Sequence, residues 1–137
     1  MALSTRGPLI GYVAAMVGGV LGALARWGVS RALPSPAGGW PWATLLVNVT
    51  GCGLIGALLA VLLARHPGHP WLRPFLVTGV LGGYTTFSTF TVDVVRLVDA
   101  GAWATATSYL LASVLGGLLA VVAGLALGRA LLRASPR

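Results

Sequence analysis

Charged residues are scarce in this sequence of 137 residues, and two of the charged residue types are absent. Lysine and glutamate do not occur, so nine arginines and two aspartates carry all of the formal charge and leave a net charge of +7. Only 8% of the residues are charged, whereas soluble domains contain about 25%. The single cysteine, Cys52, cannot close a disulfide within the chain. These shortages exclude a soluble enzyme, a disordered chain and a disulfide-stabilised scaffold.

Apolar residues make up 57% of the chain and give it a mean hydropathy of +0.91. A helix needs about 20 mostly apolar residues to cross the roughly 30 Å of hydrocarbon in a bilayer. Four runs reach that length, at residues 9–33, 42–64, 75–98 and 102–127. The sequence therefore predicts an all-α membrane protein with four transmembrane helices, in a single transmembrane domain over residues 1–137.

Short segments rich in proline and glycine separate the runs, at residues 34–39, 65–70 and 99–101. Tryptophans stand at the expected ends of the spans, where an amphipathic ring prefers the headgroup level: Trp40, Trp42, Trp71 and Trp103. The first run has one other interpretation, a secretory signal peptide cleaved after Ala25, but its glycines favour a packed helix.

The arginines bias the orientation of the spans only modestly. One side of the expected bundle carries six and the other side three: Arg6, Arg65, Arg73, Arg129, Arg133 and Arg137 against Arg26, Arg31 and Arg96. The positive-inside rule then favours cytoplasmic termini. Because the arginines are spread between apolar runs, and do not cluster with aromatics on a soluble face, we expect no nucleic-acid partner.

Glycine is abundant, with 20 residues, and several recur at helical spacing: Gly18 and Gly22, Gly53 and Gly56, and Gly124 and Gly128. Small residues on one ridge let two helix backbones approach closely in lipid, where no hydrophobic force drives helices together. Packing within the chain and an interface between two copies explain these pairs equally well. Four short helices enclose little space, so a transport path favours a second subunit.

Polar side chains recur at helical spacing in two of the spans. Thr44 and Asn48 are four residues apart in the second, and Thr105, Tyr109 and Ser113 continue at the same spacing in the fourth. Hydroxyl and amide groups donate hydrogen bonds without carrying a fixed charge, which suits a dehydrated anion. Each of them can instead bond to its own or a neighbouring helix.

The third run is the least regular. Three glycines within five positions and a series of threonines predict a break near Gly82 to Thr85, at membrane depth. Carbonyl groups freed there need protein or an ion as a partner, and a hard cation is a suitable one. Phe87 and Phe90 follow on one helical face, and the positive edges of their rings can meet an anion. Packing against lipid or another helix is the other interpretation of this pair.

No span has an acidic residue near its middle, since Asp93 and Asp99 lie towards the end of the third. A small proton-coupled four-helix multidrug exporter, the main alternative, needs an embedded carboxylate in its first span. A membrane assembly subunit that transports nothing is a third hypothesis. The chain also lacks a nucleophile triad, a metal-ligand cluster and a phosphate-binding loop, so we expect no enzyme.

Three motifs resemble the Fluc (CrcB) family of fluoride channels. They are GGVLGALARW at residues 18–27, VNVTGC at 47–52 and GGYTTFSTF at 82–90. The motifs occur in the family's order, one in each of the first three spans. The third is long and specific, and the similarity covers nearly the whole chain.

The resemblance implies a passive, fluoride-selective channel in a bacterial cell membrane, which exports cytoplasmic fluoride and so confers fluoride resistance. It also implies an antiparallel, dual-topology homodimer with two pores and a central structural sodium ion, although a related second chain is another possible partner. Backbone carbonyls of Gly82 and Thr85 would bind the sodium. Where family members can carry another hydroxyl one turn beyond Ser113, this chain has Gly117.

The residues and the resemblance together predict a fluoride pathway with eight members: Arg26, Thr44, Asn48, Phe87, Ser88, Phe90, Tyr109 and Ser113. Fluoride is small and tightly hydrated, so its entry demands replacement donors of nearly the same quality as water. Hydroxyls, an amide and aromatic edges supply them without a deep cationic trap.

Overall fold

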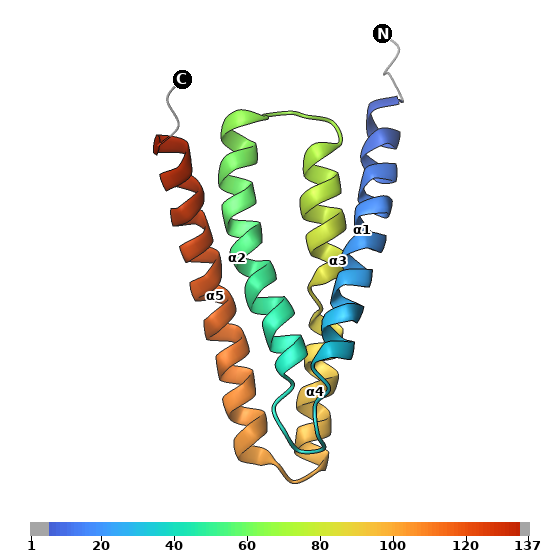
Figure 1. Cartoon of the computed structure of the whole chain (residues 1–137), viewed down its shortest axis with the longest axis vertical. Coiled ribbons are helices and arrows are strands. Elements are labelled where there is room, and N and C mark those ends of the chain that lie inside the picture. Colours follow the sequence, from blue (N-terminus) through green and yellow to red (C-terminus); the bar gives the residue numbers. More distant parts are fainter. Residues whose placement is uncertain (1–5, 135–137) are drawn as a thin grey trace.

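The computed structural model describes residues 6–134, which are all-helical apart from their connecting segments (Figure 1). In chain order the elements are α1 (Arg6–Ala32), α2 (Trp42–Arg65), the π-helical segment η1 (Pro74–Leu81), α3 (Gly82–Tyr84), α4 (Phe87–Asp99) and α5 (Trp103–Ala134). The start of α1 and the end of α5 lie at the same end of the molecule (Figure 1). Arg137, counted above in the charge bias, lies outside the described residues.

Four helical stretches are long and apolar enough to cross a membrane: Leu9–Ala32, Trp42–Arg65, Pro74–Asp99 and Trp103–Ala134. This confirms the number of spans and places most of their ends within a residue or two of the prediction. The last helix continues beyond the predicted end at residue 127, through the basic residues that follow. Each connecting segment turns at a glycine with positive φ, which side chains disfavour: Gly38 at 71°, Gly68 at 78° and Gly101 at 72°.

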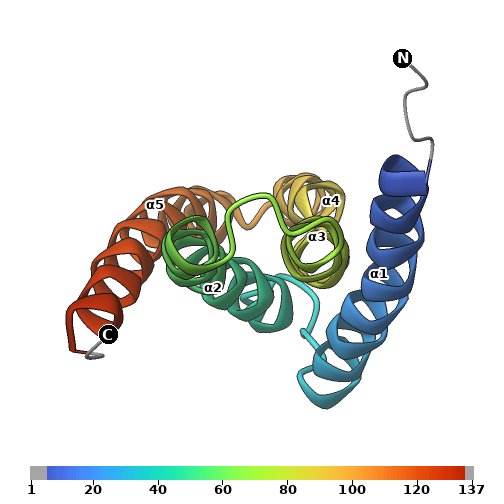
Figure 2. The same cartoon turned by 90° about the horizontal axis from the view of Figure 1, so that it is seen from above.

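The helices pack most closely as two pairs, α2 with α5 and α1 with η1 and α3. Seen from above, α5 lies on one flank beside α2, and α1 lies on the other flank beside α3 (Figure 2). Glycines make both approaches possible. A Cβ on Gly124 would overlap the carbonyl of Gly53 in α2, and a Cβ on Gly22 would overlap the carbonyl of Val80 in η1. These glycine pairs therefore pack helices within the chain, the first of the two interpretations above.

The third span is broken where α3 ends and α4 begins. Thr85 (φ −79°, ψ 158°) and Thr86 (φ −151°, ψ 121°) are extended, and the helix restarts at Phe87. The side chain of Thr86 caps the new helix by accepting a hydrogen bond of 3.1 Å from the backbone N–H of Thr89. The predicted break is thus present, within the third candidate span, Pro74–Asp99.

The break lies at the C-terminal end of the predicted range, Gly82 to Thr85. Gly82 and Gly83 were expected to interrupt the helix, but both are helical. A Cβ on Gly83 would overlap the carbonyl of Gly19 in α1, so helix packing outweighs the low helix propensity of this glycine. The β-branched Thr85 and Thr86 take the extended backbone instead.

Candidate functional site

Asn48 of α2 holds the broken backbone in place. Its side-chain Nδ2 donates a hydrogen bond of 2.9 Å to the carbonyl of Thr86, and its Oδ1 accepts one of 2.8 Å from the N–H of Thr86. The amide thereby replaces the partner that the N–H of Thr86 loses at the break, and it adds a second hydrogen bond to the carbonyl of this N-cap residue. Asn48 was predicted to donate a hydrogen bond to fluoride in the pathway. In the structure its side-chain amide holds the backbone of Thr86, and one of the two amide hydrogens remains available for another acceptor.

Thr44 lies one turn before Asn48 on α2 and contacts the second half of the third span. It is buried, and its Oγ1 donates a hydrogen bond of 2.7 Å to Oδ2 of Asp93 in α4. The sequence analysis did not include Asp93 in the site, because it lies towards the end of the span. Its spacing does carry a signal, since Phe87, Phe90 and Asp93 are three residues apart and share one face of a helix.

Tyr109 and Ser113 of α5 present two buried hydroxyls to the same region. Tyr109 is fully buried, and its hydroxyl lies beside Thr44, Asp93 and Ser113. Among the described residues, however, neither the Tyr109 hydroxyl nor Ser113 Oγ has a partner in hydrogen-bonding geometry. A buried hydroxyl without a partner costs about 1–3 kcal/mol, so such groups are rare unless a water or an ion satisfies them.

Aromatic rings border these hydroxyls. The ring centroids of Phe90 and Tyr109 are 5.5 Å apart, and those of Phe87 and Phe90 are 5.8 Å apart. Trp40 meets Tyr109 edge to face at 6.2 Å on the other side. Phe90 is half-buried in this cluster, whereas Phe87 is 80% exposed.

Four of the predicted residues meet in one cavity of about 260 Å³. Its lining residues come from α2, the break, α4 and α5: Asn48, Cys52, Ile55, Thr85, Thr86, Phe87, Phe90, Ser113 and Val114. The structure thus brings Asn48, both phenyl rings and Ser113 together in one lining. Cys52 also lines this cavity.

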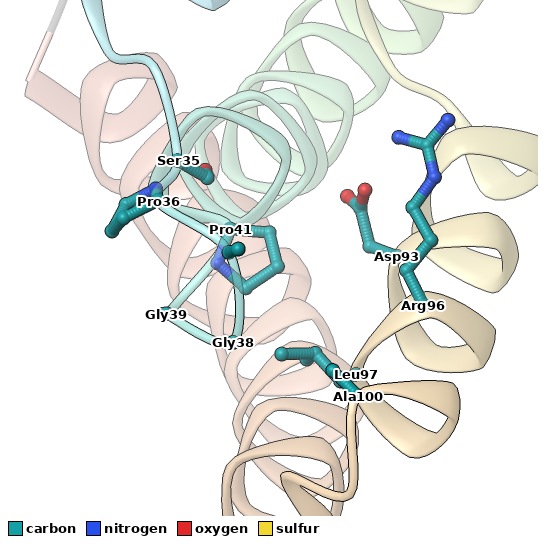
Figure 3. A pocket seen from close by; sticks show the side chains of 10 residues that line it. Ser35, Pro36, Gly38, Gly39, Pro41, Asp93, Arg96, Leu97 and Ala100 are labelled. Carbon is teal, nitrogen blue, oxygen red and sulfur yellow. The ribbon is translucent and has the colours of Figure 1, made fainter.

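A second cavity of about 360 Å³ lies at the α4–α5 turn end of the molecule and includes Asp93 and Arg96 in its lining (Figure 3). The two cavities are joined by polar side chains. Asp93 lines the second cavity and bonds to Thr44, while Tyr109 lies beside Thr44 and next to Ser113, which lines the first. A polar track therefore runs from one cavity to the other through the protomer.

Two predicted pathway residues lie elsewhere in the protomer. Arg26 of α1 donates a hydrogen bond of 3.0 Å from Nε to the carbonyl of Gly83, and so fastens α1 to the third span. Ser88 is exposed, with its Oγ 3.3 Å from Oγ1 of Thr86. Gly117 is buried where the hydroxyl series would continue, and a Cβ there would lie 3.5 Å from Sγ of Cys52.

The break also carries the two carbonyl groups predicted to bind sodium. Gly82 is exposed, and a Cβ there would meet only the carbonyl of Val77, at 3.8 Å, so its backbone is open to approach. Thr85 directs its own N–H and Oγ1 back to the carbonyl of Leu81, at 2.9 and 2.8 Å. Within residues 6–134 no group of three or more His, Cys, Asp or Glu side chains could hold a metal. Backbone carbonyl oxygens are ligands of the kind that hard cations take.

The sequence model of the family described as "CrcB-like protein, Camphor Resistance (CrcB)" matches residues 13–125 of this chain. The chain belongs to the CrcB family. The match covers all four spans except the ends of the first and last, and so contains every residue of the track and of the break.

Curated members of the CrcB family are similar along most of the chain. A "Fluoride-specific ion channel FluC" of Bordetella petrii is 50% identical over 123 residues, which cover 89% of this chain and 94% of that protein. Proteins of the same name from Paracoccus denitrificans and Rhizobium meliloti are 48% and 47% identical, covering 88% and 83% of this chain and 95% and 92% of their own. With four apolar helices and such relatives, this CrcB protein is a multi-pass bacterial membrane protein.

Proposed function

We propose that this protein is a fluoride-selective ion channel, through which cytoplasmic fluoride leaves the cell passively down its electrochemical gradient and which thereby gives fluoride resistance. The observation that carries the proposal is the pair of buried, unpartnered hydroxyls of Tyr109 and Ser113, set between two cavities. Its relatives over almost the full length bear the name of fluoride-specific channels.

The chemistry of the track suits this ion. Fluoride gives up tightly held water only where other donors replace it, and the track offers hydroxyls and the remaining amide hydrogen of Asn48. Among the described residues no arginine lines the cavity of about 260 Å³, so none of them would place a fixed positive charge there to retain the ion. Fluoride is also the anion of a weak acid, which enters an acid-exposed cell as neutral HF and ionises inside. A passive pore therefore suffices for export.

A proton-coupled multidrug exporter is the competing function. Its mechanism needs a carboxyl group that alternates between a proton and the substrate, and the described part of the first span, Leu9–Ala32, contains none. Asp93 is the one acidic residue that reaches the track, and its Oδ2 accepts a hydrogen bond from Thr44 at one end of it. The position of this carboxyl, away from the middle of the span, favours the passive channel.

The functional unit we propose is an antiparallel, dual-topology homodimer with a structural sodium ion at its centre. Phe87 is 80% exposed although it lines the cavity, so a single protomer encloses the pathway on one side only and a second copy would complete it. The open backbone at Gly82, next to the break, suits carbonyl groups shared between two copies. Bound sodium would supply a positive charge that neutralises the carbonyl dipoles. A related second chain is the alternative partner.

Fluoride efflux from proteoliposomes, followed with a fluoride electrode, tests the channel. We expect rapid loss of fluoride, slow loss of chloride and no dependence on an imposed proton gradient. Transport that follows the proton gradient would support the exporter instead, and absence of flux from protein shown to be folded would reject transport altogether.

Replacing sodium with a large organic cation tests the proposed assembly. We expect the dimer to weaken, its conduction to fall, or both, and rubidium or caesium should restore neither because they are too large for the same carbonyl cage. Chemical cross-linking and the efflux assay report the two effects separately. Assembly and flux that are both indifferent to sodium would remove the ion from the proposal.

A further inference from the structure

The series of hydroxyls on α5 stops at Gly117. Tyr109 and Ser113 are four residues apart, and both have a buried hydroxyl without a partner among the described residues. The next position at this spacing is a buried glycine, and residues 114–128 are all apolar or glycine. Beyond Ser113, α5 therefore offers an ion no side-chain donor until Arg129.

A second polar series runs along α2. Thr44, Asn48 and Cys52 follow one another at intervals of four residues, so they share one face of the helix. In both views α2 lies beside α5 (Figure 1, Figure 2), and these two helices form one of the two closest pairs. Residues 53–64 are all apolar or glycine, so Cys52 is the last polar side chain on α2 before Arg65.

The sulfur of Cys52 lies next to the place that a side chain on Gly117 would occupy. A Cβ on Gly117 would lie 3.5 Å from Sγ, an ordinary contact distance. The thiol lines the cavity of about 260 Å³ together with Asn48 and Ser113, and it forms no hydrogen bond with the described residues. The buried, unpartnered Oγ of Ser113 marks this cavity as an anion site independently of the cysteine.

We propose that Cys52 is a donor of the fluoride pathway, whose S–H takes over from α5 where Gly117 provides no hydroxyl. The inference rests on the proposed fluoride conduction and adds to it one residue from the facing helix. A thiol donates a hydrogen bond more weakly than a hydroxyl does and carries no fixed charge. It would therefore hold the ion only loosely at the end of the series, which favours departure.

The first test compares fluoride efflux of Cys52→Ala and Cys52→Ser in proteoliposomes. Alanine removes the donor, so we expect efflux to fall about threefold or more, whereas serine keeps a donor and should retain at least about half of the flux. Unfolding in detergent, measured on the same preparations, shows that the variants are folded.

The second test distinguishes a donor from a residue that only fills space. Cys52→Ala leaves room beside Gly117, and a Cβ added at Gly117 would extend into that room. We therefore combine Cys52→Ala with Gly117→Ser or with Gly117→Ala. Both double variants add the same Cβ, but only serine adds a hydroxyl. Efflux of the serine combination should recover to within about twofold of the unaltered protein, and the alanine combination should stay as slow as Cys52→Ala.

Ser108→Ala is the matched control on α5. Its exposed Oγ donates a hydrogen bond of 3.1 Å to the carbonyl of Thr105 in its own helix and lines neither cavity, so efflux should not change. Undiminished efflux of Cys52→Ala, or a Cys52→Ser variant as slow as Cys52→Ala, would overturn the inference. Equal efflux of the two double variants would also overturn it and assign Cys52 to packing. If the unaltered protein conducts no fluoride, the proposed function fails instead.

Discussion

The side-chain amide of Asn48 forms two hydrogen bonds with the backbone of a single residue, Thr86, at 2.9 Å from Nδ2 to the carbonyl and 2.8 Å from the N–H to Oδ1. The amide substitutes for the helical partner that the N–H of Thr86 loses at the break. The same side chain lines the cavity that holds both phenyl rings. One residue of α2 therefore both holds the broken backbone and lines the cavity.

Replacing Asn48 with alanine should destabilise the protein strongly. The N–H of Thr86 would lose its hydrogen-bond partner and the carbonyl would keep only the first bond of α4, so we expect a loss of roughly 1–3 kcal/mol. Denaturant unfolding in detergent measures it. Thr91→Val serves as the control, because its exposed Oγ1 bonds only to the carbonyl of Phe87 in its own helix, and should cost less than about 0.5 kcal/mol. Equal stability of Asn48→Ala and the unaltered protein would contradict the role of this pair.

In contrast to Asn48→Ala, the variants Tyr109→Phe and Ser113→Ala should lose fluoride efflux without losing stability. Because neither hydroxyl has a hydrogen-bond partner among the described residues, removing it should leave the free energy of unfolding unchanged or raise it by up to about 1 kcal/mol. Fluoride efflux should fall roughly ten- to hundredfold for either variant, since a hydrogen bond to a charged group is worth about 1.5–3 kcal/mol. Unfolding and efflux are measured on the same preparations. Lost stability with intact flux would mean that the hydroxyls are structural.

Most of the fold follows from the lengths of the apolar runs and the glycine spacing. The position of the break does not, because it depends on which helix lies against each glycine. Gly83 has a low helix propensity, yet it stays helical under the carbonyl of Gly19 in another span. The π-helical segment Pro74–Leu81 likewise has no pattern in the sequence that predicts it.

The candidate site was predictable to the extent that helical spacing places residues on one face. That spacing puts Asn48, Phe90 and Ser113 each on the polar or aromatic face of its own helix. The packing of the three helices then brings these faces together in one cavity. Asp93 was missed because the sequence analysis considered only its place towards the end of the third span. It did not consider that Asp93 shares a helix face with Phe87 and Phe90, whose spacing it continues. The hydrogen bond of Arg26 to α3 depends on the approach of α1, which the sequence does not specify.

A comparison of Gly124→Ala with Gly28→Ala should distinguish the effect of helix packing on stability from that of helix propensity. Its new Cβ would overlap the backbone carbonyl of Gly53, which cannot rotate away, so we expect α2 and α5 to part at a cost of about 1–3 kcal/mol or more. Gly28→Ala makes the same chemical change where no atom lies within 4 Å, and should stabilise the helix by up to about 1 kcal/mol. Thermal unfolding of the two variants in detergent gives both values. Similar effects at the two positions would mean that α2 and α5 are not in close contact.

Phe87→Ile and Phe90→Ile should both reduce fluoride efflux but differ in their effect on stability. Phe87 is 80% exposed, so its substitution should change the free energy of unfolding by less than about 0.5 kcal/mol. Phe90 contacts the ring of Tyr109 at 5.5 Å between centroids, and an aromatic pair of this kind contributes about 0.5–1.5 kcal/mol. Unfolding measurements distinguish the two positions.

Efflux then decides what the exposed ring does. A phenylalanine that only covers lipid-facing surface can be replaced by isoleucine without effect, because both are apolar and of similar reach. A ring whose positive edge meets the ion cannot, since isoleucine has no such edge. Reduced efflux for Phe87→Ile, with cross-linking that still yields the dimer, would therefore assign the exposed face of Phe87 to the pathway. Unchanged efflux for both variants would leave the two rings as packing residues and confine fluoride to the hydroxyls of α5.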